Sequence, residues 1–582
     1  NTAYLWSGQR TEVFTTGART YGVIGDPAVD FTTKRPDASI GVTAQSNMIS
    51  KRGDGLTVVP SFEYQGRRFI LDGNLSYSDS NSRYDPLGKE GAIFSLVNSP
   101  SASGNFTATR DGLGKQNWTI TQTSGDDWSN PASYTRQTAA IVINSQDGRA
   151  ARTEMIGAAL NLAVKAPFKF APVTFKTGLK AKRAVYDYQN ERLAHQYRYV
   201  GPLTVAQFMT ENASPNELSF DGLDIRYASK SGSDSLYMPS NSKIGALFLA
   251  HPELFQHTIT AANYYTAYIE NTRHFEEDTN AAYLMATSEL NDRLTVRAGL
   301  RWEETKTRAR EWNPLTADET RAAGFAVSAS TGRATTIDGI KYQYQSRPQI
   351  DRKGSYDYFF PSASLKFAVD TKTDFQLGYS RTIRRPEVNV LAGVWSVNDE
   401  AMLVTAPNPG LKPEISDNLS IRVTRYFEPV GLVALNYFQN NVKGLFQSED
   451  LTADEFGYTG GEYANYTFRT TRTVSGDSIK IRGVEAEFTH ALDYLPSPLN
   501  GLTVRGSYTY LDPEEPIPLS AKHLTSLVLA YKKGPLGLNV NTLWTGRKLN
   551  SVSTGSYIAP RVDMFVSGAY ALRKGWSLFF SA

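Results

Sequence analysis

Residues 294–303 read Leu-Thr-Val-Arg-Ala-Gly-Leu-Arg-Trp-Glu, so that every second side chain belongs to an apolar series and the others are mostly polar. Successive side chains of a β-strand point to opposite faces of the sheet, so this pattern predicts a strand with one apolar face and one polar face. The sequence therefore predicts an all-β fold built from antiparallel strands. The same alternation returns in segments 362–369, 374–380, 419–423, 433–437, 502–510, 538–544 and 562–572.

The connections between these segments are of two kinds. Segments 368–374, 426–431 and 531–535 are short and are predicted to form tight turns. This arrangement predicts an up-and-down meander with short turns at one rim and long loops at the other. The apolar phase changes at Gly483, where we expect a β-bulge. The long polar stretches that would form the loops are 81–150, 189–256, 303–353, 383–414 and 448–477, with a short helical patch at 243–256.

Composition narrows the classes of function. The 582 residues carry 61 Lys and Arg against 58 Asp and Glu, so the net charge is +3, which argues against a surface that gathers nucleic acid. There is no cysteine, which excludes disulfides, thiolate metal sites and cysteine nucleophiles. The longest apolar run, 244–250, is far shorter than the roughly 18–20 residues of a membrane helix.

Three features favour a membrane barrel over a soluble β-protein. Segments 292–307, 355–369 and 430–446 are long enough for tilted membrane strands. Aromatic side chains recur near strand ends, as at 356–360, which is typical of interfacial girdles. Charged side chains recur at mid-strand on the polar face, which must therefore be wet and is expected to line the lumen: Arg297, Arg301, Lys366, Arg422, Arg482 and Arg505. A barrel in lipid must be a closed sheet because its backbone amides have no water to pair with. A large secreted β-sandwich array remains the alternative.

Several segments resemble a known family in the order in which that family carries them. Residues 408–420, NPGLKPEISDNLS, resemble the NP-x-LKPE-x-S-x-N stretch of TonB-dependent outer-membrane receptors. Residues 379–386, YSRTIRRP, are similar to the family's YS-x-T-x-x-RP, and residues 481–487, IRGVEAE, to its I-x-GVE-x-E strand. Segments 281–301 and 502–512 also fit, so the resemblance covers roughly residues 260–582.

The resemblance implies a large antiparallel transmembrane barrel with long extracellular loops, of about 22 strands in the full family fold and fewer in this chain. In the family an N-terminal plug closes the barrel and a TonB box couples it to the TonB–ExbB–ExbD complex. We expect residues 1–582 to be barrel, with 1–35 forming either strand and loop or the tail of a plug, and both ends of the family fold to be missing from this chain. The motif residues expected to have structural roles are Arg385, Pro386, Asn408, Pro409, Leu411, Lys412, Pro413, Glu414 and Gly483.

The function that the resemblance implies is transport without covalent chemistry. We expect no catalytic residue, cofactor or metal site, and the six scattered histidines show no metal-binding spacing. The protein would lie in the outer membrane of a Gram-negative bacterium and import a scarce oligosaccharide, iron chelate or cobalamin-like solute. Expected partners are outer-membrane lipids or lipopolysaccharide, the TonB complex, the solute and a surface lipoprotein, but no nucleic acid.

Aromatic side chains in the long loops are candidate ligand platforms because rings stack on sugars and on aromatic ligands. Packing of loop against loop would use the same residues, so both interpretations stay open. Arg384 could grip an anionic ligand, or could serve the strand-to-loop junction. A passive porin, a secreted adhesin or lectin, and a glycosidase are the other functions considered. The candidate aromatics are Trp118, Trp128, Tyr134, Tyr197, Tyr199, Trp312, Tyr342, Tyr344 and Trp395.

Overall fold

The fold is known from a computed structural model. It describes residues 2–12, 23–26, 30–33, 36–43, 45–84, 94–96, 100–112, 117–136, 140–145, 148–168, 171–216, 219–220, 223–224, 226–398, 402–428, 430–458, 465–473, 478–517, 519–551, 556–573 and 575–581.

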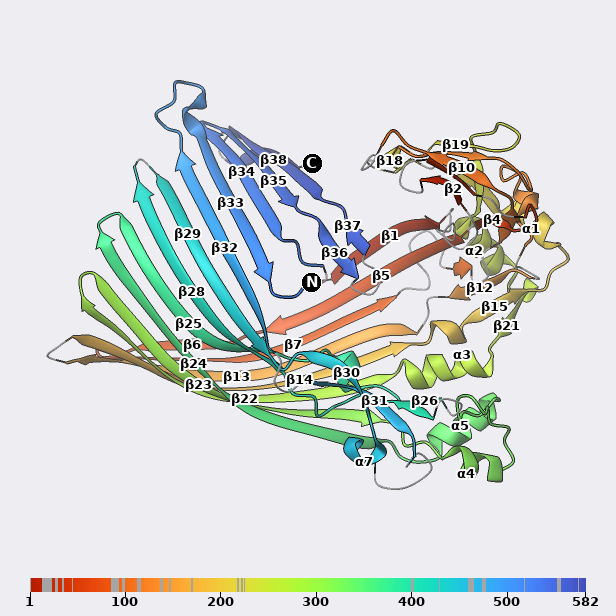
Figure 1. The fold of residues 1–582 in the computed structure, drawn as a ribbon, viewed down its shortest axis with the longest axis horizontal. Helices are drawn as coiled ribbons and strands as arrows, with labels where there is room; N and C mark the ends of the chain where they lie inside the picture. Colours follow the sequence, from red (N-terminus) through yellow and green to blue (C-terminus); the bar gives the residue numbers. More distant parts are fainter. Residues whose placement is uncertain are drawn as a thin grey trace.

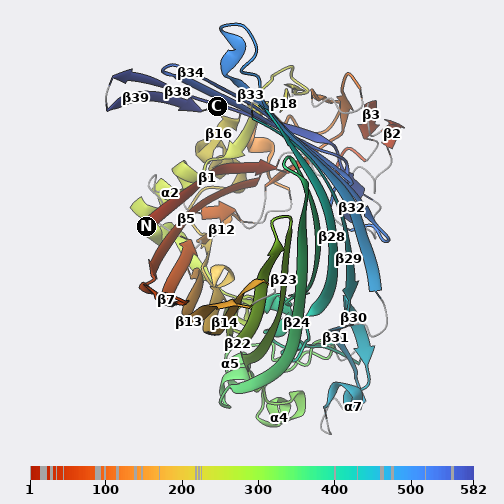
Figure 2. The same cartoon turned by 90° about the vertical axis from the view of Figure 1, so that its left-hand side faces the viewer.

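One sheet of 18 strands forms the wall of the molecule (Figure 1). It curves around an interior, as Figure 2 shows, and pairing proceeds from β1 (Thr2–Glu12) to β39 (Trp576–Ser581). Within the described residues these two end strands are not paired with each other. The other strands of the wall are β5 (Gln45–Val58), β6 (Ser61–Gln65), β7 (Phe69–Tyr84), β13 (Arg149–Pro167), β14 (Pro172–Asn190), β22 (Arg273–Asn291), β23 (Leu294–Glu311), β24 (Ile350–Asp370), β25 (Thr373–Arg384), β28 (Glu414–Phe427), β29 (Gly431–Lys443), β32 (Ser478–Ala491), β33 (Leu502–Pro513), β34 (His523–Lys533), β35 (Leu536–Thr545) and β38 (Arg561–Arg573).

The two rims of the wall differ as the sequence predicts. Residues 371–372 join β24 to β25, residues 428–430 join β28 to β29, and residues 534–535 join β34 to β35. These connections confirm the predicted tight turns. At the other rim the connections are long, for example 85–148 between β7 and β13 and 191–272 between β14 and β22. The wall is therefore an up-and-down meander with loops gathered at one end.

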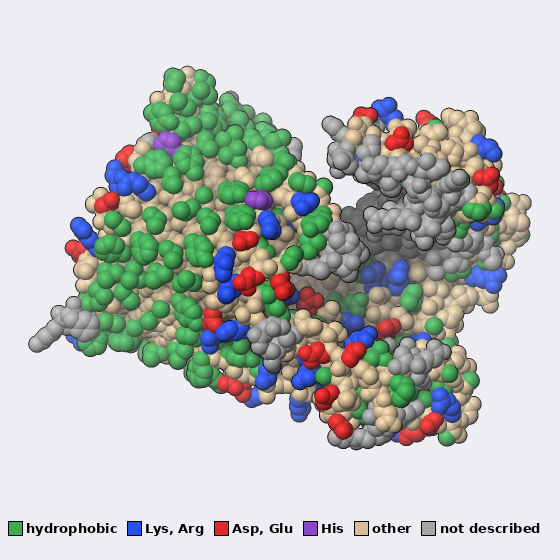
Figure 3. Space-filling model, in the orientation of Figure 1, with side chains coloured by type: hydrophobic (Ala, Val, Ile, Leu, Met, Phe, Trp, Pro, Cys, Tyr) green, Lys and Arg blue, Asp and Glu red, His purple; other side chains and the backbone are tan. Residues whose placement is uncertain are grey.

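The outward face of the wall is apolar over a continuous band. Leu179, Leu284 and Phe359 are 63%, 57% and 54% exposed, although each lies in the middle of a regular strand. The register places the apolar residues of neighbouring strands opposite one another, as in the Leu284–Leu300 pair. Figure 3 shows apolar side chains covering the half of the visible wall that ends in the short turns. Such a surface avoids water only if it contacts lipid.

The band has the height of a bilayer. On β24 the outward apolar residues run from Phe359 to Val369, which is ten residue steps. At about 3.3 Å per residue and a tilt of about 40°, these steps cover about 25 Å, the height of the apolar band in membrane barrels. Beyond the band, Figure 3 shows a belt of charged side chains between the apolar surface and the loops.

Three expectations need correction, one about a β-bulge and two about the direction of side chains. Strand β32 pairs with β29 without any register shift, so Gly483 carries no bulge. A methyl group at Gly483 would overlap the ring of Phe438, its cross-strand neighbour, which explains the glycine instead. Arg482 lies on the outward face and contacts Gln439, whereas the other predicted mid-strand charges face the interior. Within 356–360 only the odd positions face outward, so the tyrosines there line the interior.

The long loops fold into two lobes at the rim that carries the long connections, called the open rim below (Figure 1). The first lobe comprises described residues of segments 23–43, 94–145 and 191–258. It contains a five-stranded sheet, a four-stranded sheet, three strand pairs and short helices. Its elements are β2 (Val23–Asp26), β3 (Asp30–Thr33), β10 (Phe106–Thr109), β11 (Thr119–Gln122) and β19 (Arg226–Ala228); β8 (Phe94–Leu96), β12 (Val142–Ser145), β15 (Gln196–Tyr199) and β21 (Phe255–Thr258); β4 (Ile40–Thr43), β9 (Ser101–Ser103), β16 (Ala213–Asn216), β20 (Leu236–Pro239), β17 (Ser219–Phe220) and β18 (Leu223–Asp224); and η2 (Pro131–Ser133), η3 (Arg192–Ala194), η4 (Pro252–Leu254), α1 (Val205–Asn212) and α2 (Asn241–Ala250).

The second lobe comprises described residues of segments 261–272, 312–349, 388–413 and 444–473. A four-stranded sheet and several short helices build it. None of the helices that the structure describes is long and apolar enough to cross a membrane. The elements of the second lobe are α3 (Ala261–Tyr265), η5 (Thr266–Glu270), α4 (Ala317–Ala322), α5 (Ile337–Gln345), α6 (Val388–Leu391), α7 (Ala453–Phe456), β26 (Ser396–Asn398), β27 (Leu403–Thr405), β30 (Phe446–Leu451) and β31 (Thr467–Thr473). Outside both lobes lie η6 (Leu499–Gly501), β36 (Lys548–Ser551) and β37 (Ser556–Ile558).

Candidate functional site

The candidate site is the loop-bearing rim, where the motif segment 384–414 meets the inner wall. Arg385 leaves the end of β25 and reaches across the interior to two carboxylates, Glu303 on β23 and Glu277 on β22. Both carboxylates are largely buried, with side-chain exposures of 11% and 14%. Arg301 also binds Glu303, at 2.6 Å. The predicted motif arginine therefore ties its loop to two strands of the wall.

The turn at 408–411 is held on both sides. The amide nitrogen Nδ2 of Asn408 donates to the carbonyl of Thr471 at 2.9 Å, which fixes the turn to the second lobe. The hydroxyl of Thr307 on β23 donates to the carbonyl of Pro409 at 2.8 Å, which fixes it to the wall. Leu411 is 3% exposed and packs into a core beside Phe275. The segment thus joins lobe and barrel.

Glu414 begins β28 and closes this junction. It accepts a hydrogen bond from the guanidinium of Arg384 at 3.1 Å and another from the backbone N–H of Phe446 at 3.2 Å. The Arg384 guanidinium also lies 5.6 Å from the Phe446 ring. Even so, the side chain of Arg384 stays 68% exposed, so it is held in place and also open to a ligand.

Several predicted ligand aromatics lie inside the lobes. Trp128 and Tyr134 are 0% exposed in the core of the first lobe. The indole Nε1 of Trp128 donates to the carbonyl of Ser103 at 2.7 Å, and the Tyr134 hydroxyl donates to the carbonyl of Trp128 at 2.8 Å. Burial raises the pKa of Tyr134. These residues pack loop against loop, which is one of the two roles that the sequence left open.

The other predicted aromatics are divided between core and surface. Tyr199 and Tyr344 are 8% and 7% exposed, within separate lobe cores. Tyr342 is 38% exposed and contacts Phe325, with the ring centroids 5.1 Å apart and the rings tilted by 32°. The remaining four are partly buried against the same clusters, and their role in ligand binding stays a prediction. They are Trp118, Tyr197, Trp312 and Trp395.

A polar pocket of about 460 Å³ lies between the motif turn and the second lobe. Lys412 lines it from the motif, Thr470 and Arg472 from β31, and Glu455 from α7. Ammonium, guanidinium, hydroxyl and carboxylate groups converge there, so the pocket can bind a hydrophilic solute through several hydrogen bonds. Arg472 and Glu455 were missed because no local pattern links positions in separate loop elements to the motif turn.

The first lobe has its own electrostatic anchor. The carboxylate of Asp126 accepts hydrogen bonds from the backbone and hydroxyl of Ser103, at 3.1 and 2.7 Å, and pairs with Arg136 at 3.3 Å. Burial raises the pKa of Asp126, but the bonds from Ser103 and Arg136 outweigh it and leave the pKa below its ordinary value. Among the described residues no cluster of three or more His, Asp or Glu side chains could hold a metal ion.

Comparison with known proteins gives a matching family and several similar structures. Its residues 97–582 match the family model described as TonB dependent receptor-like, beta-barrel. Similar solved structures include the siderophore receptor PiuA from Acinetobacter baumannii, with 12% identity, TM-score 0.46, and coverage of 95% of this chain and 74% of that one. The ferric-catecholate import receptor Fiu from K12 E. coli has 12% identity, TM-score 0.46, and coverage of 100% and 76%. The copper transporter OprC has 10% identity, TM-score 0.44, and coverage of 94% and 68%.

No curated protein matches the chain. The family model nevertheless covers most of the sequence, including every motif segment from 281 to 512 on which the resemblance rests. Proteins of this family are receptors and transporters of the Gram-negative outer membrane. The chain therefore belongs to the TonB-dependent receptor family and forms its β-barrel.

Proposed function

We propose that the protein binds a scarce solute at its extracellular lobes and imports it into the periplasm with energy delivered by the TonB–ExbB–ExbD complex. The observation that carries the proposal is the junction at the open rim. There the motif segment is bound at once to the inner wall through Arg385 and to the second lobe through Asn408. A movement of the lobe on ligand binding would therefore be transmitted to the inside of the barrel.

The solute class follows from the pocket beside this junction. It offers both donors and a carboxylate, and exposed Arg384 lies on the same segment as Asn408 and Lys412. We propose a hydrophilic solute with several hydrogen-bonding groups: an oligosaccharide, an iron chelate or a cobalamin-like molecule. The proposed contacts among the predicted residues are those whose side chains keep some exposure: Arg384, Tyr342, Trp118, Tyr197, Trp312 and Trp395.

Uptake measured in paired strains tests this proposal. Cells that carry the full-length receptor, with or without a functional TonB, receive labelled ferric chelate, cobalamin or oligosaccharide in turn. We expect one class to accumulate in the periplasm only when TonB is present. Accumulation that does not depend on TonB would overturn the proposal and identify a passive porin instead.

Two variants locate the binding site in the same assay. Arg472→Gln removes the guanidinium that lines the pocket, and we expect uptake at limiting solute to fall about tenfold, since a hydrogen bond to a charged group contributes about 1.5–3 kcal/mol. Arg321→Gln is the matched control, because that arginine pairs with Asp318 on α4 and does not line the pocket. Equal losses in both variants would remove the pocket from the proposal.

A further inference from the structure

Three lysines line the inner face of β14, one of the strands that curve around the interior in Figure 2. Lys176, Lys180 and Lys182 occupy even positions, whereas Leu179, which is 63% exposed on the lipid side, occupies an odd one. Because side chains alternate along a strand, all three lysines point into the interior. At about 3.3 Å per residue, the six steps from Lys176 to Lys182 cover about 20 Å. These three residues are called the lysine track below.

The lysine track has no counterion among the described residues. None of its three ammonium groups forms an ion pair or a hydrogen bond with that part of the chain. The neighbours of Lys180 on the adjacent strands are Ala159 and Ala281, and the neighbour of Lys182 on β13 is Gly157. Such small side chains leave the ammonium groups uncovered, so the charge of the track faces the lumen directly.

The carboxylates at the level of the track are engaged elsewhere on the described wall. Glu303 and Glu277 bind Arg385 at the junction. Asp72 on β7 accepts a hydrogen bond at 2.7 Å from an asparagine of β13. Glu289 is farther off, beside the short turn that follows β22. The track is therefore a stretch of positive charge that its surroundings leave unneutralised.

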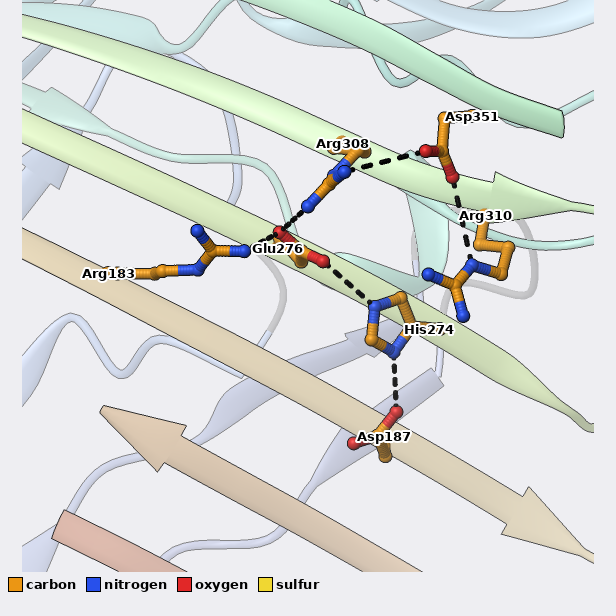
Figure 4. A network of polar contacts seen from close by, with 7 residues as sticks. All are labelled: Arg183, Asp187, His274, Glu276, Arg308, Arg310 and Asp351. Carbon is orange, nitrogen blue, oxygen red and sulfur yellow. Dashed lines mark hydrogen bonds and ion pairs between the residues drawn. The ribbon is translucent and has the colours of Figure 1, made fainter. Parts of the chain in front are cut away.

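The outward face of the same strand shows the opposite arrangement. There Arg183 binds Glu276 on β22, and Asp187 contacts His274 at 2.6 Å (Figure 4). Charged groups on that face are thus paired from strand to strand, whereas the lysines on the inner face are not. Unpaired charge of one sign on a concave wall attracts ions of the opposite sign and raises their local concentration. The inner face of β14 is therefore suited to attract anions into the lumen.

We propose that the lysine track guides an anionic solute, one that carries carboxylate or phosphate groups, along the inner wall. The inference rests on the proposed function and narrows the class of its solute. Lys180 lies in the same row as Glu303, the carboxylate that Arg385 binds at the junction, so the track begins beside the proposed site. A lysine ammonium is a point charge on a flexible stem. It attracts carboxylate and phosphate without the fixed, bidentate fork of an arginine, which suits passage better than retention.

Labelling of the lysines with an anionic and a neutral reagent tests the inference for any solute. Pyridoxal phosphate and pyridoxal both form an imine with a lysine, and only the first carries a phosphate. Each is added to the folded, full-length protein in detergent, the imine is reduced with borohydride, and the labelled peptides are quantified by mass spectrometry. We expect the ratio of the two labelling rates at low salt to be at least about tenfold higher at the track than at lysines outside the lumen. The difference should disappear in 1 M salt, where charges are screened within about 3 Å.

Lys372 and Lys443 are the reference lysines in the same molecule. Both are exposed, Lys372 in the short turn between β24 and β25 and Lys443 on the outward face at the end of β29. The same ratio of rates at the track and at the reference lysines would overturn the inference. A track that neither reagent labels in the folded protein would also overturn it, because another part of the protein would then cover the lysines.

Uptake separates this inference from the proposed function. In the uptake assay described above, Lys176→Gln/Lys180→Gln/Lys182→Gln should lower the TonB-dependent accumulation of the labelled probe at least about tenfold at limiting concentration. The charge-preserving Lys176→Arg/Lys180→Arg/Lys182→Arg and the control Lys372→Gln/Lys443→Gln should keep it, and a gel shift on boiling shows that each variant is folded. Unchanged uptake by the triple glutamine variant, or accumulation of an uncharged oligosaccharide alone, would overturn the inference and leave the proposed function intact. Accumulation without TonB would overturn the proposed function, while the labelling rates still decide whether the track attracts anions.

Discussion

Leu284 offers a sharp test of whether the apolar band faces lipid. Its side chain is 57% exposed and lies on the outward face of β22, near the middle of the band. On the same face the polar Asn280 lies toward the lobes and Leu290 lies toward the short turn. In water, replacing such an exposed leucine changes stability by no more than about 0.5 kcal/mol. At the midplane of a bilayer, an arginine on the lipid face of a barrel costs about 2–4 kcal/mol. The same substitution therefore gives two clearly different results in the two environments.

The expected effect of Leu284→Arg is a decrease of about 2–4 kcal/mol in the free energy of unfolding. At 1.4 kcal/mol per factor of ten, this lowers the ratio of folded to unfolded protein by about 30- to 700-fold. The assay is denaturant-dependent folding into lipid vesicles, followed by tryptophan fluorescence. Ser362→Arg is the matched control, since Ser362 is exposed on the inner face of β24 opposite Gly299 and Ser380, and an arginine there stays in water. Equal, small effects of the two variants would refute the membrane orientation.

Three further predictions concern the lobes and the wall. Trp128→Ala empties a fully buried site and should destabilise the first lobe by about 3–5 kcal/mol, seen as faster proteolysis within that lobe while the wall stays resistant. Because Asp126 has a lowered pKa, its ionised form stabilises the lobe above about pH 4, and this contribution is lost as the pH falls through the folded-state pKa. The protection factor of the Ser103 amide, which compares its exchange rate with the intrinsic rate at the same pH, should therefore fall on acidification in the wild type, whereas in Asp126→Asn it should be low at both pH values. Gly483→Val should destabilise the barrel by about 1–3 kcal/mol through overlap with Phe438, and Phe438→Ala should restore part of the loss.

The wall could be predicted from the sequence because its rule is local. A strand with one face in lipid alternates at every second residue, and residues 294–303 carry that alternation without needing their neighbours. The same rule gave the wrong reason for Gly483. A change of apolar phase indicates either a bulge or a change in what each face contacts. Here the register is unbroken and the glycine makes room for a ring on the adjacent strand.

The lobes could not be predicted because their pairing is distant in sequence. β3 pairs with β10 across more than 70 residues, and β11 pairs in parallel with β19 across more than 100. Local patterns do not reveal such partners, so the segments were expected to be polar loops. For the same reason the sequence could identify Trp128 as a conspicuous loop aromatic but could not separate ligand contact from core packing. The structure shows the core.

The motif segment, residues 384–414, could be predicted less fully than the wall and more fully than the lobes. The sequence predicts structural roles for Arg385, Asn408 and Glu414, and the structure gives each of them a partner. What the sequence lacked was the identity of the partners, since Glu277 and Glu303 lie about a hundred residues upstream on other strands. Long-range ion pairs of this kind leave no spacing signal in a single sequence.

Extraction behaviour tests the central claim, that the sheet is a barrel embedded in the outer membrane. Outer membranes from cells that produce the protein are washed with high salt and alkaline carbonate, and the protein is then run on a detergent gel before and after boiling. The protein should stay in the membrane until detergent releases it, and its unheated band should shift on boiling as the barrel unfolds. Release by the aqueous washes, together with a band that does not shift, would contradict the account.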